Sequence, residues 1–92
     1  MLPFDRQGTV HKQGGEELAE IDLAIWPAAL STTNVGEAYD HTGEAPADAA
    51  EHLVRKANRE IRVDGRRFKI VEAHLHGYMP HVGLRLREIR NG

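Results

Sequence analysis

Residues 59–71 read REIRVDGRRFKIV, and this stretch decides the fold. Two short runs of alternating apolar and polar residues flank Asp64-Gly65, the dipeptide that favours a two-residue type I′ turn between antiparallel strands. Such a turn sets the register, because residues equally distant from it must face each other across the hairpin. The stretch therefore predicts a β-hairpin whose core face carries Ile61, Val63, Phe68 and Ile70.

The outer face of the same hairpin carries charges. In this register Glu60 faces Lys69, which is a favourable pair, but Arg62 faces Arg67. Like charges directly opposite each other destabilise a strand pair by up to about 1 kcal/mol. We therefore predict that acidic side chains of a neighbouring subunit approach Arg62 and Arg67.

Two other segments alternate with a period of two, as half-buried strands do. In residues 21–26 the alternation stops at Pro27, and in residues 81–90 the arginines Arg85 and Arg87 lie on the outer face. The inward side chains of the two segments are Ile21, Leu23, Ile25, Val82, Leu84 and Leu86.

The remaining segments predict one helix, one long loop and an N-terminal arm. In residues 46–57, Pro46 occupies a first helical position and apolar residues recur at a spacing of three to four, which predicts the helix. Residues 31–45 show no sustained period, so they predict a loop, and an unstructured connection of ~15 residues is often functional. Residues 1–17 predict an arm or a loose hairpin, because three glycines interrupt a polar stretch.

Together these elements predict one domain over residues 1–92 with a mainly β fold. We expect a small antiparallel β-barrel or curled sheet, with one helix at about 46–57 and a long loop at 31–45. A chain of 92 residues buries only about 60–65% of the surface that its unfolded form exposes, so its own core is thin. Association with other chains is one way in which such small domains gain stability.

Charge is divided unevenly along the chain. Residues 1–52 contain two basic and ten acidic side chains, whereas residues 53–92 contain ten basic and four acidic side chains. The total charge of −2 argues against a simple nucleic-acid-binding protein, which usually carries a positive charge. A chain with one acidic and one basic part can pack against copies of itself, and the division therefore favours assembly.

The sequence offers few groups for chemistry. There is no cysteine, and no nucleophile is paired with a base at a recognisable spacing. His74, His76 and His81 could converge as the three histidines of a zinc site do, although histidines at the surface are the more common case. We predict a protein that is not an enzyme, with no catalytic residues, no cofactor and no metal.

The chain shows no segment for export or membrane insertion. Its first residues lack the basic and apolar regions of a signal peptide, and its longest apolar run, residues 23–30, is too short to span a bilayer. We therefore expect a soluble chain that is first cytoplasmic.

A nucleic-acid-binding barrel is an alternative. Arg62, Arg66, Arg67 and Lys69 could grip phosphates, and Phe68 could stack on a base. The alternation nevertheless places Phe68 on the core face, away from Arg67 and Lys69, so base stacking is not expected. A basic surface that meets an acidic neighbour explains these residues better.

Three short segments resemble a known family. They are residues 22–27 (DLAIWP), 61–71 (IRVDGRRFKIV) and 82–88 (VGLRLRE). Their apolar strand ending in Trp-Pro, their V-D-G hairpin and their closing V-x-L-x-R strand are similar to those of the head-completion proteins of long-tailed bacteriophages. The most similar members are the head-to-tail stopper, or head-closure, connector proteins.

The resemblance implies a structural virion protein in the neck between capsid and tail. Such proteins form rings of roughly twelve copies below the portal and adaptor, retain the packaged double-stranded DNA and provide the surface to which the tail attaches. The copies contact each other, the adaptor or portal and the tail proteins, and DNA passes without sequence-specific binding. An adaptor or a tail-terminator type of ring protein is an alternative identification, because V-D-G hairpins also occur in phage adaptor and tail-tube proteins.

This hypothesis assigns roles to two sets of residues. The candidate subunit interface consists of outward basic side chains, which are Arg62, Arg67, Lys69, Arg85 and Arg87. The acidic loop at 31–45 is the candidate channel or inter-ring element, and its residues of interest are Asn34, Glu37, Tyr39, Asp40 and Glu44.

Overall fold

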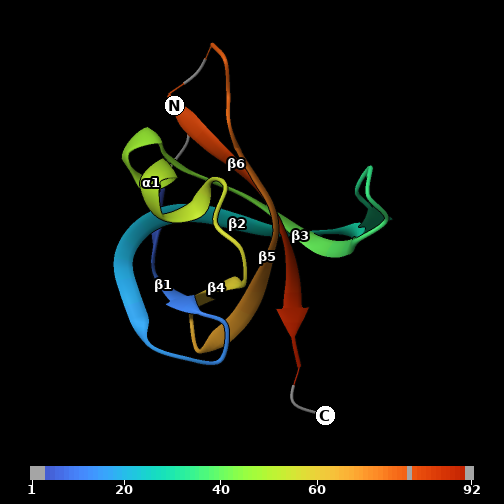
Figure 1. The fold of residues 1–92 in the computed structure, drawn as a ribbon, viewed down its shortest axis with the longest axis horizontal. Coiled ribbons are helices and arrows are strands. Elements are labelled where there is room, and N and C mark those ends of the chain that lie inside the picture. The colour runs from blue at the N-terminus through green and yellow to red at the C-terminus, as the bar shows by residue number, and fades with distance from the viewer. Residues whose placement is uncertain (1–3, 79, 91–92) are drawn as a thin grey trace.

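The computed structural model describes residues 4–78 and 80–90, which form a closed barrel of six antiparallel strands (Figure 1). A single turn of 3₁₀ helix, η1 (Ala47–Ala49), and a four-residue helix, α1 (Ala50–Leu53), connect the third strand to the fourth. Around the barrel the strands follow the order β1-β2-β3-β6-β5-β4. Their bounds are β1 Arg6–Lys12, β2 Glu17–Thr32, β3 Ala38–Pro46, β4 Arg59–Val63, β5 Arg66–Leu75 and β6 His81–Ile89. The prediction of a mainly β fold with a small antiparallel barrel is confirmed.

The hairpin of β4 and β5 has the predicted register. Arg62 faces Arg67 and Glu60 faces Lys69, as the two-residue turn requires. The turn residues Asp64 and Gly65 have φ angles of 53° and 72°, the positive values that a type I′ turn needs at both positions. The register was predictable because the turn chemistry and the alternation of apolar residues agree with each other.

The core fills the inside of the barrel with the inward side chains of the strands. Phe68, Leu23, Ile61, Leu86, Val10 and Val82 are among its fully buried side chains. Leu53 of α1 and Ala49 of η1 belong to the same cluster, so the short helix closes the core from the side. The predicted inward faces of residues 21–26 and 81–90 are confirmed for Ile21, Leu23, Val82, Leu84 and Leu86.

The predicted helix over residues 46–57 is wrong in length. Pro46 is the last residue of β3 and faces His81, and the α-helix ends at Leu53 because Val54 is extended. Arg55 and Asn58 then adopt positive φ angles of 60° and 56°, which reverse the chain. The physical reason is connectivity: β4 must begin at Arg59 beside Lys12 of β1, and a helix continued to residue 57 would carry the chain away from that position.

The predicted long loop over residues 31–45 is also wrong. β2 continues to Thr32 and β3 begins at Ala38, so only residues 33–37 form a turn. The alternation of β3 is hard to see in the sequence because its buried positions hold His41, Gly43 and Ala45 instead of large apolar residues. A Cβ atom at Gly43 would lie 2.7 Å from the carbonyl oxygen of Ala24, so a small residue is required there.

Residues 6–12, within the segment for which an arm or a loose hairpin was expected, form strand β1 of the barrel. β1 pairs with β2 from Arg6 opposite Leu23, and with β4 from Lys12 opposite Arg59. The polar composition of this segment arises because one face of β1 is open to solvent while Val10 points into the core.

The close contact at Gly43 gives a direct test of the β2–β3 packing. Gly43→Ala should lower the free energy of unfolding by about 1–3 kcal/mol, because the methyl group would force the two strands apart. Gly77→Ala is the matched control, since a Cβ atom at Gly77 would meet nothing within 4 Å. Urea unfolding of both variants measures the difference. Equal stabilities of the two variants would show that β2 and β3 are not packed as described.

Candidate assembly surface

The structure brings most of the charged residues singled out in the sequence together on one outer face, formed by β3, β6 and β5. Lys69 Nζ lies 3.5 Å from Glu37 Oε2. Arg87 Nε lies 3.7 Å from Asp40 Oδ2. The register explains both contacts, because the acidic strand β3 pairs with the basic strand β6 and β6 pairs with β5.

Arg85 completes this outer face with two partners. Its Nη1 atom lies 3.4 Å from Glu72 Oε1, and its guanidinium carbon lies 5.1 Å from the ring centroid of Tyr39, at the distance of a cation–π contact. Residues expected at a subunit interface (Lys69, Arg85) thus contact residues expected in a channel loop (Glu37, Tyr39) within the same chain. Exposed pairs of this kind contribute only about 0–1 kcal/mol each, so their main effect is to reduce the net charge of this face.

Asn34 lies apart from this face, at the turn between β2 and β3. Thr33 and Glu37 close the turn through a hydrogen bond from the Thr33 N–H to the Glu37 carbonyl at 2.8 Å. Gly36 has a φ angle of 85°, which only glycine adopts readily, so the turn is a built structure. Asn34 and Val35 are exposed at its tip.

The predicted repulsion between Arg62 and Arg67 is relieved inside the chain. Glu60, which is fully buried, accepts a hydrogen bond from Arg62 Nε at 2.9 Å and two from Arg67, at 2.7 and 2.9 Å. It also accepts the Gly14 N–H at 2.6 Å. The arginine pair therefore needs no carboxylate from a neighbouring subunit to offset its repulsion. Glu60 faces Lys69 as predicted, but its carboxylate binds Arg62 and Arg67 instead of Lys69.

These contacts change the acidity of Glu60. The hydrogen bonds from Arg67 lower the pKa of Glu60 from 4.5 to about 2, against the effect of burial, with further lowering from Gly14 and Arg62. Because the folded-state pKa lies below that of the unfolded chain, the ionised carboxylate stabilises the fold fully above about pH 4.5. This contribution is lost as the pH falls from 4.5 towards 2.

Glu60→Gln tests this role. We expect the variant to lose about 2 kcal/mol of unfolding free energy at pH 7, because charged hydrogen bonds to two arginines are weakened. Its stability should also fall less than that of the wild type between pH 4.5 and pH 2. Glu16→Gln is the control, since Glu16 is exposed and pairs with the exposed Lys12. Thermal unfolding at several pH values measures both effects. If the stabilities of Glu60→Gln and wild type fell in parallel as the pH was lowered, the proposed role of Glu60 would be contradicted.

A second charged network closes the end of the barrel near the start of β5. Arg66 forms a bidentate pair with Glu88 at 2.8 and 2.7 Å, which lowers the pKa of Glu88 to about 2. Burial alone would raise the pKa of Asp40, but hydrogen bonds from His41 and from the Glu88 N–H hold it below its ordinary value. Asp40 therefore has a structural role where β3 leaves the barrel.

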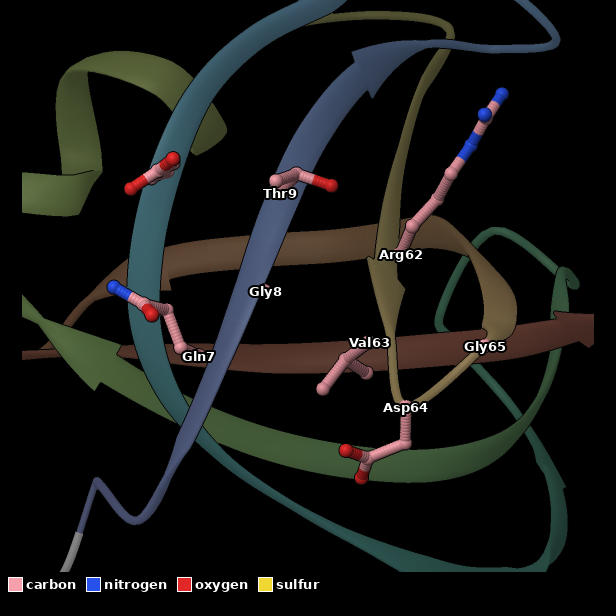
Figure 2. Close-up of a pocket in the computed structure, with 8 residues that line it drawn as sticks. Gln7, Gly8, Thr9, Arg62, Val63, Asp64 and Gly65 are labelled. Carbon is pink, nitrogen blue, oxygen red and sulfur yellow. The ribbon is translucent and has the colours of Figure 1, made fainter.

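A shallow hollow of about 260 Å³ marks the place where β1 and β4 diverge (Figure 2). The two strands pair only as far as Thr9 opposite Arg62, so Gly8 and Val63 lie beyond the last pair. Figure 2 shows the side chain of Arg62 directed away from Gln7 and Asp64. The polar groups do not converge, as they would in a small-molecule site.

The three histidines of the sequence prediction do lie close together, around Glu44 and Gly83. His76 Nε2 lies 3.2 Å from Glu44 Oε1, His81 Nδ1 lies 3.9 Å from the same oxygen, and the rings of His74 and His76 are 4.9 Å apart. Gly83 makes this possible, since a Cβ atom there would lie 3.0–3.1 Å from both His74 and His76. Within residues 4–78 and 80–90, no group of three or more His, Cys, Asp or Glu side chains has the geometry to hold a metal ion.

The histidine cluster is tested by the double variant His74→Gln, His76→Gln. It should unfold within about 1 kcal/mol of wild type, because His74 is exposed and the ion pair of His76 with Glu44 is partly open to solvent. We also expect elemental analysis of the purified wild type to find no stoichiometric zinc. One zinc per chain that is lost in the double variant would overturn the prediction that the protein holds no metal.

Three of the large exposed apolar side chains in the described residues, Trp26, Leu30 and Val35, lie in or beside residues 27–40, hereafter the projecting hairpin. Leu75 and Tyr78 are exposed elsewhere, at the end of β5 and just after it. The projecting hairpin consists of the end of β2, the turn and the start of β3, and it extends out of the barrel (Figure 1). Leu30 is 67% exposed and Val35 is 84% exposed, while Trp26 at its base is 43% exposed. Sequence reasoning missed Leu30 and Val35, because the predicted strand ended at Pro27 and residues 31–45 were expected to form a loop. Pro27 was the available signal, since proline within a strand indicates an edge.

Comparisons with known proteins yield one similarity. No family model matches the chain, and no solved structure matches it. The chain is 32% identical over 69 residues to Lon protease 2 of Herpetosiphon aurantiacus. The match covers 75% of this chain but only 8% of that protein, so it concerns a small part of Lon protease 2.

Among the helices of the described ranges, none has the length and apolar character to cross a membrane.

Proposed function

We propose that this protein is a structural subunit that assembles into a ring in the head-to-tail connector of a long-tailed bacteriophage, as a stopper or head-closure protein. The observation that carries the proposal is the projecting hairpin. A domain of 92 residues with a thin core leaves large apolar side chains on an extension that does not contribute to that core. Exposed apolar patches of this kind mark interaction sites.

The contacts between charged residues change the part that charge plays in the proposed assembly. The acidic and basic parts of the sequence meet inside each subunit, where Glu37 contacts Lys69 and Asp40 contacts Arg87. Charge therefore contributes less to association between copies than the sequence suggested. Apolar contacts and strand edges contribute more.

The same contacts weaken the nucleic-acid alternative. Arg62 and Arg67 are held by Glu60, and Lys69 lies near Glu37, so these cations already have partners. Phe68 is buried in the core and contacts His41, which leaves no aromatic platform on the basic face. In the proposed neck of the virion, DNA would pass the ring without specific binding.

We propose that the protein acts by assembly and not by catalysis. The one serine of the sequence, Ser31, donates its hydroxyl to the carbonyl of Ala29 and has no base beside it in the hydrogen bonds of the described chain. The similarity to Lon protease 2 covers too small a part of that protein to carry a proposal of proteolysis. In this proposal the partners are further copies of the chain, adaptor or portal proteins, and tail proteins.

Ring formation is tested with purified protein. Sedimentation velocity over a range of concentrations, with electron microscopy of the largest species, should show closed rings many times heavier than the 10.3 kDa chain. Replacing residues 31–39 by Asn-Gly should give a folded monomer, because the barrel pairs of β3 begin at His41. Added double-stranded DNA should not shift the sedimentation of the wild type.

The outcomes separate the candidate functions. A wild type that stays monomeric at every concentration, or a trimmed variant that still forms rings, would contradict the proposal. Tight DNA binding would favour the nucleic-acid-binding barrel instead. In phage particles built with the trimmed chain, DNA leakage or failed tail attachment is the expected result, and normal infectivity would argue against a connector role.

A further inference from the structure

The barrel leaves two long stretches of strand edge unpaired among the described residues. β1 pairs with β2 only up to Leu23, so the outer edge of β2 is unpaired over the part that enters the projecting hairpin, residues 28–32. β4 pairs with β5 only over residues 66–69, so β5 has an unpaired edge over residues 70–75. Unpaired strand edges present rows of N–H and C=O groups that can pair with another chain.

The edge of β5 exists for an identifiable reason. The register of β5 against β6 shifts between Ile70 and Glu72, which leaves Val71 as a bulged residue. A bulge bends its strand, and here the bend follows directly after the last pair with β4 at Lys69. The chain after α1 then passes β5 at a distance, and no backbone hydrogen bond joins residues 54–58 to this edge in the described structure.

The space along this edge is an open groove of about 410 Å³. Its lining is mixed: Ile70, Val71 and Ala73 of β5 and Leu53 and Ala57 opposite them are apolar, while Glu72, which lies 3.4 Å from Arg85, is acidic. Arg55 and Lys56 also line it, and neither forms an ion pair within the residues that the structure describes. The groove is therefore a recessed strand edge with a mixed lining, in which Arg55 and Lys56 have no ion-pair partner among the described residues.

The projecting hairpin has the complementary properties. It protrudes, its β2 edge is unpaired, and it carries the exposed Leu30. Its carboxylate Glu37 is about half exposed and makes only a long contact of 3.5 Å with Lys69. A strand that enters the groove would bring apolar side chains to the apolar part of the lining and a carboxylate towards Arg55 and Lys56.

We infer that the outer edge of β2 in one copy, at residues 28–32, adds as a strand to the edge of β5 in a second copy, at residues 70–75. The partner is another copy of this chain, because the two unpaired edges differ in shape and match each other. The inference rests on the proposed function and names its interface. Contact between two unlike edges is head-to-tail, so each copy keeps one edge for the next copy, and such a contact builds the proposed ring when the rotation between neighbouring copies closes.

Cross-linking tests this contact without ambiguity, because the chain has no cysteine. The double variant Leu30→Cys, Leu75→Cys places one thiol at each edge, and both leucines are exposed in the monomer. With a short bismaleimide it should give a ladder of dimers, trimers and larger products. A mixture of the two single variants should give dimers alone. The matched control is Leu30→Cys with Gln13→Cys, which keeps one edge thiol and moves the other to the exposed β1–β2 turn.

Each result decides between alternatives. Dimers formed by Leu30→Cys alone would show a two-fold contact between like edges and would overturn the inference, as would equal reaction of the control pair. A wild type that forms rings while Leu30→Cys, Leu75→Cys gives no ladder would overturn the inference and leave the proposed function standing. A wild type that stays monomeric would instead remove the proposed function.

A charge placed on either edge provides a second measurement. Leu30→Lys and Leu75→Lys should each weaken self-association by about tenfold or more, because a buried lysine in the added strand pair loses its hydration. Gln13→Lys adds the same charge on the exposed β1–β2 turn and should leave self-association unchanged. Equal effects of all three variants would attribute the weakening to net charge and contradict the edge contact.

Discussion

The closed barrel depends on one buried carboxylate. Glu60 lies on β4, the shortest strand, and joins it to its surroundings on both sides. Its oxygens accept hydrogen bonds from Arg67 of β5 and from the Gly14 N–H in the turn between β1 and β2. A five-residue strand has few backbone hydrogen bonds with which to hold two neighbours, so a charged side chain with several donors adds the missing connection. The cost of burying the charge is offset because every contact is charge-assisted or comes from a backbone N–H.

The same principle applies to the whole charge distribution of the molecule. The acidic part of the chain supplies β3, and the basic part supplies β6, which pairs with β3, and β5, which pairs with β6. The uneven distribution along the sequence thus becomes a set of local pairs on one outer face. Most of these pairs are exposed and individually weak, but together they prevent a strong field of one sign on this face.

In the described residues, the fold leaves backbone N–H and C=O groups unpaired along two strand edges and leaves several large apolar side chains exposed. Closing the barrel removes most strand edges, yet β2 extends beyond its partner β1 and β5 bends away from its partner β4. In a small domain these are the features that association can use, and the proposed assembly relies on them.

The sequence by itself determined the elements whose signals are local. The Asp64-Gly65 turn set the β4–β5 register, and the alternation of apolar residues identified the inward faces of β2 and β6. The tertiary structure alone decided the rest. β3 buries His41 and Gly43 instead of large apolar residues, so its alternation is invisible until β2 and β6 are placed beside it. The helix stops at Leu53 because β4 must reach β1, which the local pattern does not encode. The sequence also did not reveal that Glu60 is the partner of Arg62 and Arg67. The strand register places Lys69 opposite Glu60, but the long Arg67 side chain reaches diagonally to the Glu60 carboxylate. Contacts between residues far apart in the chain decide these features, and only the closed barrel brings those residues together.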